Sequence, residues 1–143
     1  MKRNVMTGIL TTLTLLLLIS VPNTYAQTTV KVTVPFNFTV GKAEMPAGTY
    51  TISRLSSSVI EIKGSTTKKS VVSIVRSEGA SSSDSTAKLV FNQYGDSYFL
   101  SQVSRGHGAD VMQLPSSKLE QEQRMASTSG VSGEKVVAAR VQK

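Results

Sequence analysis

Two alternating apolar segments flank a Gly-Asp pair in the stretch Lys88-Leu89-Val90-Phe91-Asn92-Gln93-Tyr94-Gly95-Asp96-Ser97-Tyr98-Phe99-Leu100. A two-residue connection that begins with glycine is typical of a β-hairpin, because glycine readily adopts the positive φ that the first turn position requires. We therefore predict a hairpin of Lys88–Tyr94 with Ser97–Val103, in which Phe91 lies opposite Leu100 and Asn92 opposite Phe99.

Side chains alternate between the two faces of a strand, so the hairpin has two predicted faces. One face carries Leu89, Phe91, Tyr98 and Leu100, and the other carries Val90, Tyr94, Phe99 and Val103. Because both sets are apolar, we expect both faces of the hairpin to be covered.

The segment Val30–Val40 has apolar residues at every even position. This period of two predicts an extended chain with one buried side. Pro35 cannot donate to a β-ladder, which indicates an edge, a bulge or a break into two short strands. The turn residues of Lys42–Gly48 then predict a medium loop that leads into a second alternating strand, Thr49–Ser53.

Three further strands are predicted along the chain, at Val59–Lys63, Ser70–Arg76 and Asp110–Leu114. The segment Ser70–Arg76 has apolar residues on both faces, which favours a central strand. The serine-rich segment Ser77–Thr86 is interpreted as a solvated loop.

The pattern changes near the C-terminus. Ser117-Lys118-Leu119-Glu120 matches a capping box, and strong helix formers follow, so we predict a short helix over about residues 116–126. Residues 127–143 are interpreted as a polar linker and a C-terminal tail. Within this tail, Val136–Val141 could form either a helix or an added strand.

The 143 residues therefore predict one all-β domain. We expect a single small antiparallel β-sandwich or partly closed barrel of about seven or eight short strands with one short C-terminal helix, because short strands at regular spacing with turn signals are typical of these folds.

The N-terminal segment has the parts of a secretory signal peptide. Lys2 and Arg3 precede the uncharged run Val5–Val21, and small residues lead to a cleavage position after Ala26. The alternative is an N-terminal membrane anchor, since the run reaches the lower limit of a bilayer span. We expect residues 1–26 to be removed and residues 27–126 to form the β domain. The protein would then be exported, periplasmic or extracellular, with no stable membrane span after cleavage.

The composition limits the kinds of catalytic and metal-binding site that the chain can form. The chain has no cysteine, which excludes disulfides and thiolate metal sites, and its one histidine is His107, between two glycines. No catalytic, metal-ligating or cofactor-binding residues are predicted, because no carboxylate or histidine spacing matches a known arrangement. His107 is expected in an exposed turn.

Removal of the signal lowers the formal net charge from +7 to +5. The remaining basic residues are scattered, and Lys68-Lys69 is the only adjacent pair among them. A nucleic-acid binder normally concentrates its basic residues on one face, so nucleic acid is not an expected partner. Weak attraction to anionic envelope components or polysaccharide remains open.

Three motifs together carry a resemblance to a family. They are Val34-Pro35-Phe36-Asn37-Phe38-Thr39-Val40-Gly41, then Met45-Pro46-Ala47-Gly48-Thr49-Tyr50-Thr51-Ile52, then Leu89-Val90-Phe91 with Tyr94-Gly95-Asp96-Ser97-Tyr98-Phe99-Leu100. In combination they resemble an uncharacterised family of small exported bacterial β-domain proteins, over about Val30–Ala126. The resemblance implies a compact β domain behind a signal peptide, and it implies no catalytic or binding residues.

Two functions are compatible with these observations. The first is an exported non-enzymatic β module with an interaction or structural role in the envelope or outside the cell. The alternative is a carrier of a small apolar or sugar ligand in an interior β-barrel cavity. In the carrier, Tyr94, Tyr98 and Phe99 are the predicted ligand-lining residues, whereas the competing interpretation places these aromatic side chains in the core.

Overall fold

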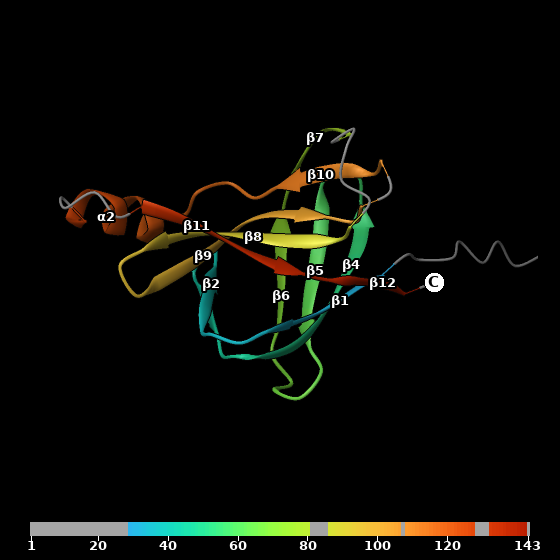
Figure 1. Ribbon diagram of the computed structural model, residues 1–143, viewed down its shortest axis with the longest axis horizontal. Coiled ribbons are helices and arrows are strands. Elements are labelled where there is room, and N and C mark those ends of the chain that lie inside the picture. The colour runs from blue at the N-terminus through green and yellow to red at the C-terminus, as the bar shows by residue number, and fades with distance from the viewer. Residues whose placement is uncertain (1–28, 81–85, 107, 128–131, 143) are drawn as a thin grey trace, which may run out of the picture.

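The computed structural model describes residues 29–80, 86–106, 108–127 and 132–142. These residues form twelve strands, in two sheets packed face to face, and one short helix (Figure 1). The predicted all-β fold is confirmed as a small β-sandwich, and the sheets do not form a closed barrel. The predicted signal peptide, residues 1–26, and His107 lie outside the described residues.

The first sheet contains five strands in the order β12-β1-β4-β5-β6, and every neighbouring pair is antiparallel. Alternate side chains of β1, β4 and β5 point into the core, as the period of two predicts. The strand bounds are β12 Arg140–Gln142, β1 Thr29–Val34, β4 Gly48–Ser56, β5 Val59–Gly64 and β6 Ser70–Ile74.

The second sheet has the order β11-β8-β9-β10-β7, and β2 joins it through a single parallel pairing of Thr39 with Phe99. Another short strand, β3, pairs with β2 in antiparallel orientation. The bounds are β11 Ser132–Ala138, β8 Lys88–Tyr94, β9 Ser97–Ser104, β10 Asp110–Gln113, β7 Arg76–Ala80, β2 Phe38–Val40 and β3 Ala43–Met45.

The predicted hairpin is confirmed as β8 and β9. Phe91 lies opposite Leu100 and Asn92 opposite Phe99. Gly95 has a φ of +59°, which a primed turn requires of its first position. The predicted face of Val103 is wrong, because the register shifts between Val90 and Phe91 and this bulge turns Val103 into the core.

The N-terminal segment forms one long hairpin with a bend in each arm. One arm breaks at Pro35 to give β1 and β2, and the other breaks at Pro46 to give β3 and β4. The outer halves, β1 and β4, pair in the first sheet, while β2 and β3 pair in the second. Of the three alternatives at Pro35, an edge, a bulge or a break, the structure has the break, whereas the expected loop at Lys42–Gly48 contains the strand β3.

Two further segments switch between the sheets. β6 continues through Val75 into β7, and β11 continues through Ala139 into β12. The prediction of a central strand at Ser70–Arg76 is therefore wrong, because β6 is the last strand of its sheet. The solvated loop expected from Ser77 onwards is also corrected, since its first residues form β7 and pair with β10.

The C-terminal segment also forms strands. Where a polar tail was expected, β11 pairs along β8 and β12 pairs with β1. Of the two alternatives for Val136–Val141, a helix or an added strand, the structure has extended chain. Val137, Ala139 and Val141 are partly buried and pack against the core.

Aromatic side chains fill the space between the sheets. The ring of Phe38 lies 5.1 Å from that of Tyr50 on the opposite sheet and 5.3 Å from that of Phe91. Phe36 lies 5.2 Å from Phe91 and stacks on Tyr98 at 4.2 Å. Edge-to-face and offset contacts of this kind add to the hydrophobic stabilisation from burial.

The single described helix, α2 (Lys118–Ala126), begins as the capping box predicts. Ser117 accepts a hydrogen bond from the Glu120 N–H at 3.1 Å. The side chain of Glu120 does not return to the cap. It instead accepts a hydrogen bond of 2.7 Å from the amide Nδ2 of Asn92 on β8, which holds the helix against the outer face of the hairpin.

Candidate interaction site

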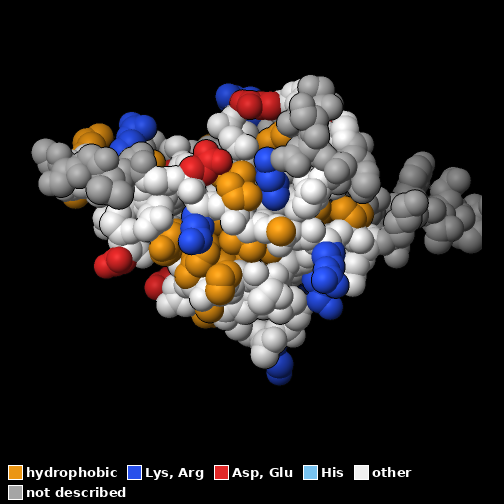
Figure 2. Space-filling view, in the orientation of Figure 1, with side chains coloured by type: hydrophobic (Ala, Val, Ile, Leu, Met, Phe, Trp, Pro, Cys, Tyr) orange, Lys and Arg blue, Asp and Glu red, His pale blue; other side chains and the backbone are white. Residues whose placement is uncertain are grey.

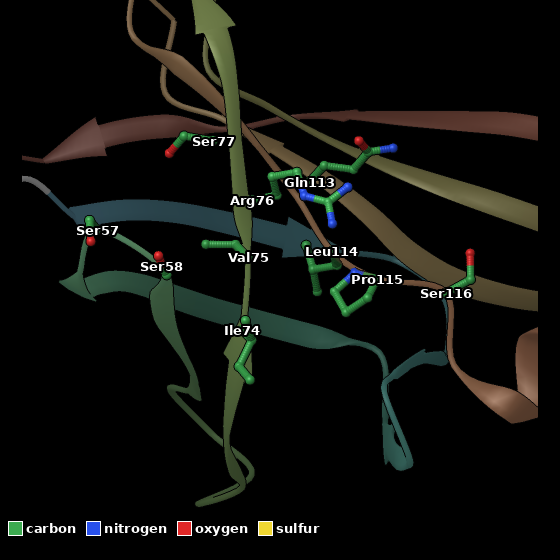
Figure 3. Close-up of a pocket in the computed structure, with 10 residues that line it drawn as sticks. All are labelled: Ser57, Ser58, Ile74, Val75, Arg76, Ser77, Gln113, Leu114, Pro115 and Ser116. Carbon is green, nitrogen blue, oxygen red and sulfur yellow. The ribbon is translucent and has the colours of Figure 1, made fainter.

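An open hollow of about 580 Å³ lies at the corner where β6 passes into β7. Three segments line it: the turn Ser57–Ser58, the bend Ile74–Ser77 and the segment Gln113–Ser116. Figure 3 shows the bend in the middle, with the serine turn on one side and Leu114–Ser116 on the other. The hollow is a surface feature, since its residues come from turns and strand ends.

The local sequence explains why the strands separate here. The Val75 N–H donates to Ser58 O at 2.8 Å, which is the last backbone bond between this bend and the first sheet. On the other side, Gln113 is the last residue of β10 that pairs with β7, where it lies opposite Arg76. Pro115 follows two residues after Gln113 and has no N–H to extend the ladder. The two ladders therefore stop on either side of the bend.

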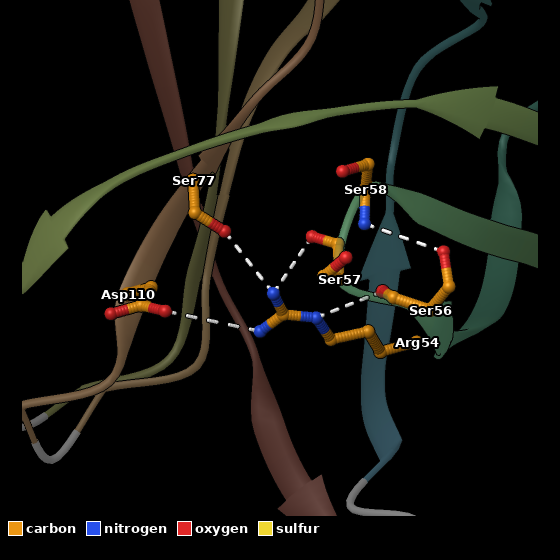
Figure 4. A network of polar contacts seen from close by, with 6 residues as sticks. All are labelled: Arg54, Ser56, Ser57, Ser58, Ser77 and Asp110. Atoms are coloured by element: carbon orange, nitrogen blue, oxygen red, sulfur yellow. Dashed lines mark hydrogen bonds and ion pairs between the residues drawn. The ribbon is translucent and has the colours of Figure 1, made fainter.

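Arg54 on β4 connects the two sheets beside the hollow (Figure 4). Its guanidinium donates to Ser56 O at 3.0 Å, to Ser57 O at 2.8 Å and to the hydroxyl of Ser77 on β7 at 3.1 Å. Asp110 on β10 lies 3.9 Å away from the same group. The planar guanidinium suits this role, because it directs several donors at fixed angles.

The backbone of β6 presents one unpaired edge. Two backbone bonds at the ends of the β5–β6 pairing show which way β6 faces: Gly64 N donates to Lys69 O, and Val75 N donates to Ser58 O. Lys69 and Val75 therefore direct these groups toward β5, and so do the odd-numbered residues between them, Val71 and Ser73. Backbone groups alternate in direction along a strand. The N–H and C=O groups of Ser70, Val72 and Ile74 therefore point away from β5, where the described chain places no further strand.

The side chains of this edge strand include two exposed apolar groups. Val72 is 60% exposed and Ile74 is 69% exposed. Figure 2 shows hydrophobic side chains gathered near the middle of the visible face of the molecule, with Lys and Arg side chains spaced around them. An exposed, uncharged edge strand is a template for pairing with another chain.

Basic residues lie at both ends of β6. Lys68 and Lys69 precede the strand and Arg76 follows it. The ammonium of Lys69 donates to Glu44 O at 3.1 Å, which is a neutral acceptor and leaves the positive charge uncompensated by that contact. Glu61 on β5 accepts a hydrogen bond from Ser70 Oγ at 2.8 Å. The strand β6 itself is thus uncharged in its centre and basic at its ends, and Glu61 on the neighbouring β5 lies opposite Val72.

The three aromatic residues predicted to line a ligand site lie on two different faces of the hairpin and do not form one site. Tyr98 is on the inner face of β9, where it stacks on Phe36. Tyr94 and Phe99 are on the outer face, with rings 5.9 Å apart, and both are buried. None of the three lines the hollow at the bend.

Tyr94 belongs instead to a polar cluster beneath α2. Burial raises the pKa of the Tyr94 phenol above its ordinary value, the Glu120 carboxylate raises it further, and Arg124 lowers it. Glu120 is itself only 5% exposed. A buried carboxylate needs hydrogen-bond partners, and Asn92 supplies one. This cluster joins the helix to the sheet.

Sequence reasoning did not find the edge at β6. No local signal marks this edge, because Val71, Val72 and Ile74 give the segment apolar residues on both faces, as in a central strand. Edge position itself depends on which strands pair, and short-range patterns do not encode that.

Within the described part of the chain, no group of three or more Asp, Glu, His or Cys side chains has the arrangement of a metal site. The one described helix has neither the length nor the apolar character needed to cross a membrane. No protein-family model matches the sequence, and comparisons with curated proteins and with solved structures give no significant match. The basis for assigning a function is therefore the geometry of the β6 edge and of the hollow beside it.

Proposed function

We propose that this protein is an exported, non-enzymatic β module that acts by binding another component of the cell envelope or of the extracellular space. The observation that carries the proposal is the edge of the first sheet, where Val72 and Ile74 are exposed at 60% and 69% beside an open hollow. Monomeric proteins usually protect such an edge, so its exposure supports a role in contact with another molecule.

The packing between the sheets favours this function over that of a ligand carrier. A carrier needs an enclosed apolar volume that surrounds most of its ligand. Here the interior is occupied by interlocking rings, and the side chains of Tyr50 and Phe91 are at most 1% exposed. The hollow at the bend is open to solvent, so it does not enclose a ligand.

The first 26 residues support the export part of the proposal. The basic start at Lys2 and Arg3, the uncharged run to Val21 and the exit at Ala26 are the features that signal peptidase recognition requires. An exported protein with a formal net charge of +5 would also be attracted to the anionic polymers of an envelope.

Fractionation of a bacterial host that expresses the full chain tests the export step. We expect the protein outside the cytoplasm, with an N-terminus at Gln27 when it is sequenced. Recovery of membrane-bound material that begins at Met1 would replace export by anchoring.

Binding is tested by sedimentation of the exported chain with purified envelope preparations. We expect saturable cosedimentation that persists at salt concentrations which screen surface charges. Titration with a long-chain fatty acid and with a disaccharide tests the carrier. One-to-one binding of either, with no envelope binding, would overturn the proposal in favour of the carrier.

A further inference from the structure

We propose that the free edge of β6 accepts an extended segment of a partner polypeptide, with apolar side chains at alternate positions and acidic residues at both ends. The segment would join the first sheet as an additional strand beyond β6. This inference rests on the proposed function and adds the surface and the class of partner to it.

The backbone of β6 offers hydrogen bonds in the right direction. The N–H groups of Val72 and Ile74 point away from β5, as do the carbonyls of Ser70 and Val72. These groups lie at every second residue, which is the spacing of a β-ladder. Strand addition uses such main-chain bonds for affinity and alternate side chains for specificity.

The side chains of the edge favour an apolar centre in the partner. Val72 and Ile74 point to the same face, because they are two residues apart, and both are largely in water. A strand laid beside β6 would bring its own side chains to about 5 Å from theirs. Apolar side chains at alternate positions of the partner would remove both groups from water.

The hollow provides space for the partner beyond the end of β6. On this side of the bend, β10 pairs with β7 only as far as Gln113, and the chain then leaves through Pro115. Ile74 lines the hollow at this point, and on this side of the bend Leu114, Pro115 and Ser116 line it as well. A partner segment can run along β6 and end in the hollow.

The charges at the two ends distinguish the partner from a second copy of this chain. Antiparallel pairing of two β6 strands about Val72 would place Lys68 of one copy opposite Arg76 of the other. Parallel pairing would place Lys69 beside Lys69. Like charges directly opposite one another destabilise a strand pair, so self-pairing is disfavoured. Acidic ends on the partner would be attracted to the same residues.

The strand itself lacks the usual protection of an edge. Ser70-Val71-Val72-Ser73-Ile74 contains neither a charged residue nor a proline, although natural edge strands commonly carry one of these to prevent pairing. The basic residues stand at its ends, where they select the charge of a partner without blocking the ladder.

The probe for the test is an end-capped synthetic peptide with valine at alternate positions, threonine between them and glutamates at both ends. Its control has lysines in place of the glutamates. Binding to the exported chain is followed by calorimetry. We expect saturable one-to-one binding of the acidic peptide and at least about tenfold weaker binding of the lysine peptide.

Amide hydrogen exchange gives a residue-specific readout. The N–H groups of Val72 and Ile74 should exchange rapidly in the free protein and slowly with the acidic peptide bound. The N–H groups of Val71 and Ser73 already pair with β5, so they should be protected in both states. Peptide binding that leaves Val72 and Ile74 exchanging rapidly would overturn strand addition at this edge.

A pair of variants separates the edge from general surface effects. Val72→Lys places a charge in the centre of the edge, and Leu55→Lys makes the same change in charge at an apolar side chain that is 53% exposed on β4. We expect Val72→Lys to weaken peptide binding by about tenfold or more and Leu55→Lys to change it less than about twofold. Circular dichroism checks that both variants remain folded.

The remaining outcomes are distinguishable. If the parent formed a concentration-dependent dimer that Val72→Lys dissociates, the edge would bind a second copy of this chain, and the proposal of a different partner polypeptide would be wrong. Envelope binding that Val72→Lys leaves unchanged would overturn the edge as the binding surface and leave the proposed function standing. Absence of both envelope and peptide binding in the parent would overturn both.

Discussion

The amide oxygen Oδ1 of Asn37 accepts a hydrogen bond of 2.9 Å from the N–H of Ala47. These residues stand at the two bends of the N-terminal hairpin, one in each arm. Next to them, the hydroxyl of Tyr50 donates to Pro46 O, which fixes the second bend from inside the core. The bond between Asn37 and Ala47 therefore joins the two points at which the hairpin passes from one sheet to the other.

Asn37→Ala removes the acceptor for the Ala47 N–H. We expect a loss of about 0.5–1.5 kcal/mol in the free energy of unfolding, measured with urea, because the site is exposed and water can replace part of the bond. Asn37→Asp keeps an oxygen acceptor at the same position and should lose less. Equal losses in the two variants would show that this hydrogen bond does not hold the bends.

Gly95→Val tests the turn of the β8–β9 hairpin. Gly95 has a φ of +59°, a conformation that a β-branched residue disfavours, so we expect a loss of about 1–3 kcal/mol. Gly79→Val is the matched control, because a Cβ at either position meets open space and only Gly95 has positive φ. Thermal unfolding should separate the two variants, and equal midpoints would contradict the turn geometry.

Arg54→Met removes the group that connects β4 with the second sheet. Three hydrogen bonds from a charged donor are lost, and we expect a destabilisation of about 1–3 kcal/mol. Asp110→Asn removes only a half-exposed ion pair at 3.9 Å, which should contribute less than about 1 kcal/mol. If Asp110→Asn cost as much as Arg54→Met, the ion pair and not the serine contacts would hold this corner.

Glu120→Ala tests the attachment of α2 to the sheet. The change leaves the Asn92 amide without its 2.7 Å acceptor beneath the helix, and we expect a loss of about 1–3 kcal/mol. Glu122→Ala makes the same change on an exposed position of the same helix, where about 0.5 kcal/mol or less is expected. Urea unfolding compares the two, and similar values would mean that the buried contact does not stabilise the fold.

The pH dependence of stability follows from Tyr94. Because its pKa is raised in the folded state, the folded protein holds the phenol proton more tightly than the unfolded chain does. The resulting stabilisation is fully present below about pH 10, the ordinary tyrosine pKa, and is lost as the pH rises through the folded pKa. Tyr50 is shifted in the same direction, by burial.

Urea unfolding at a series of alkaline pH values measures this dependence. We expect the free energy of unfolding to fall above about pH 10, and Tyr94→Phe to reduce the slope of that fall. A slope that is unchanged in Tyr94→Phe would show that other groups dominate the alkaline response.

Local patterns were sufficient for several parts of the fold. The period of two predicted an all-β fold, and the Gly-Asp turn predicted the β8–β9 hairpin. Ser117 predicted the start of α2. The structure confirms all three. These features depend on residues a few positions apart, whose geometry is set by backbone sterics and short-range hydrogen bonds.

The edge of the first sheet was decided by contacts between distant segments. Val72 and Val75 look alike in the sequence, yet Val72 is in water and Val75 is 3% exposed in the core. The difference arises because the chain leaves one sheet for the other at Val75, and that bend exists only once β5 pairs on one side and β10 on the other. In the same way, the bulge in β9 turns Val103 inward, and α2 covers Tyr94. Strand order and register follow from the total burial of the folded chain, so no local window of sequence contains them.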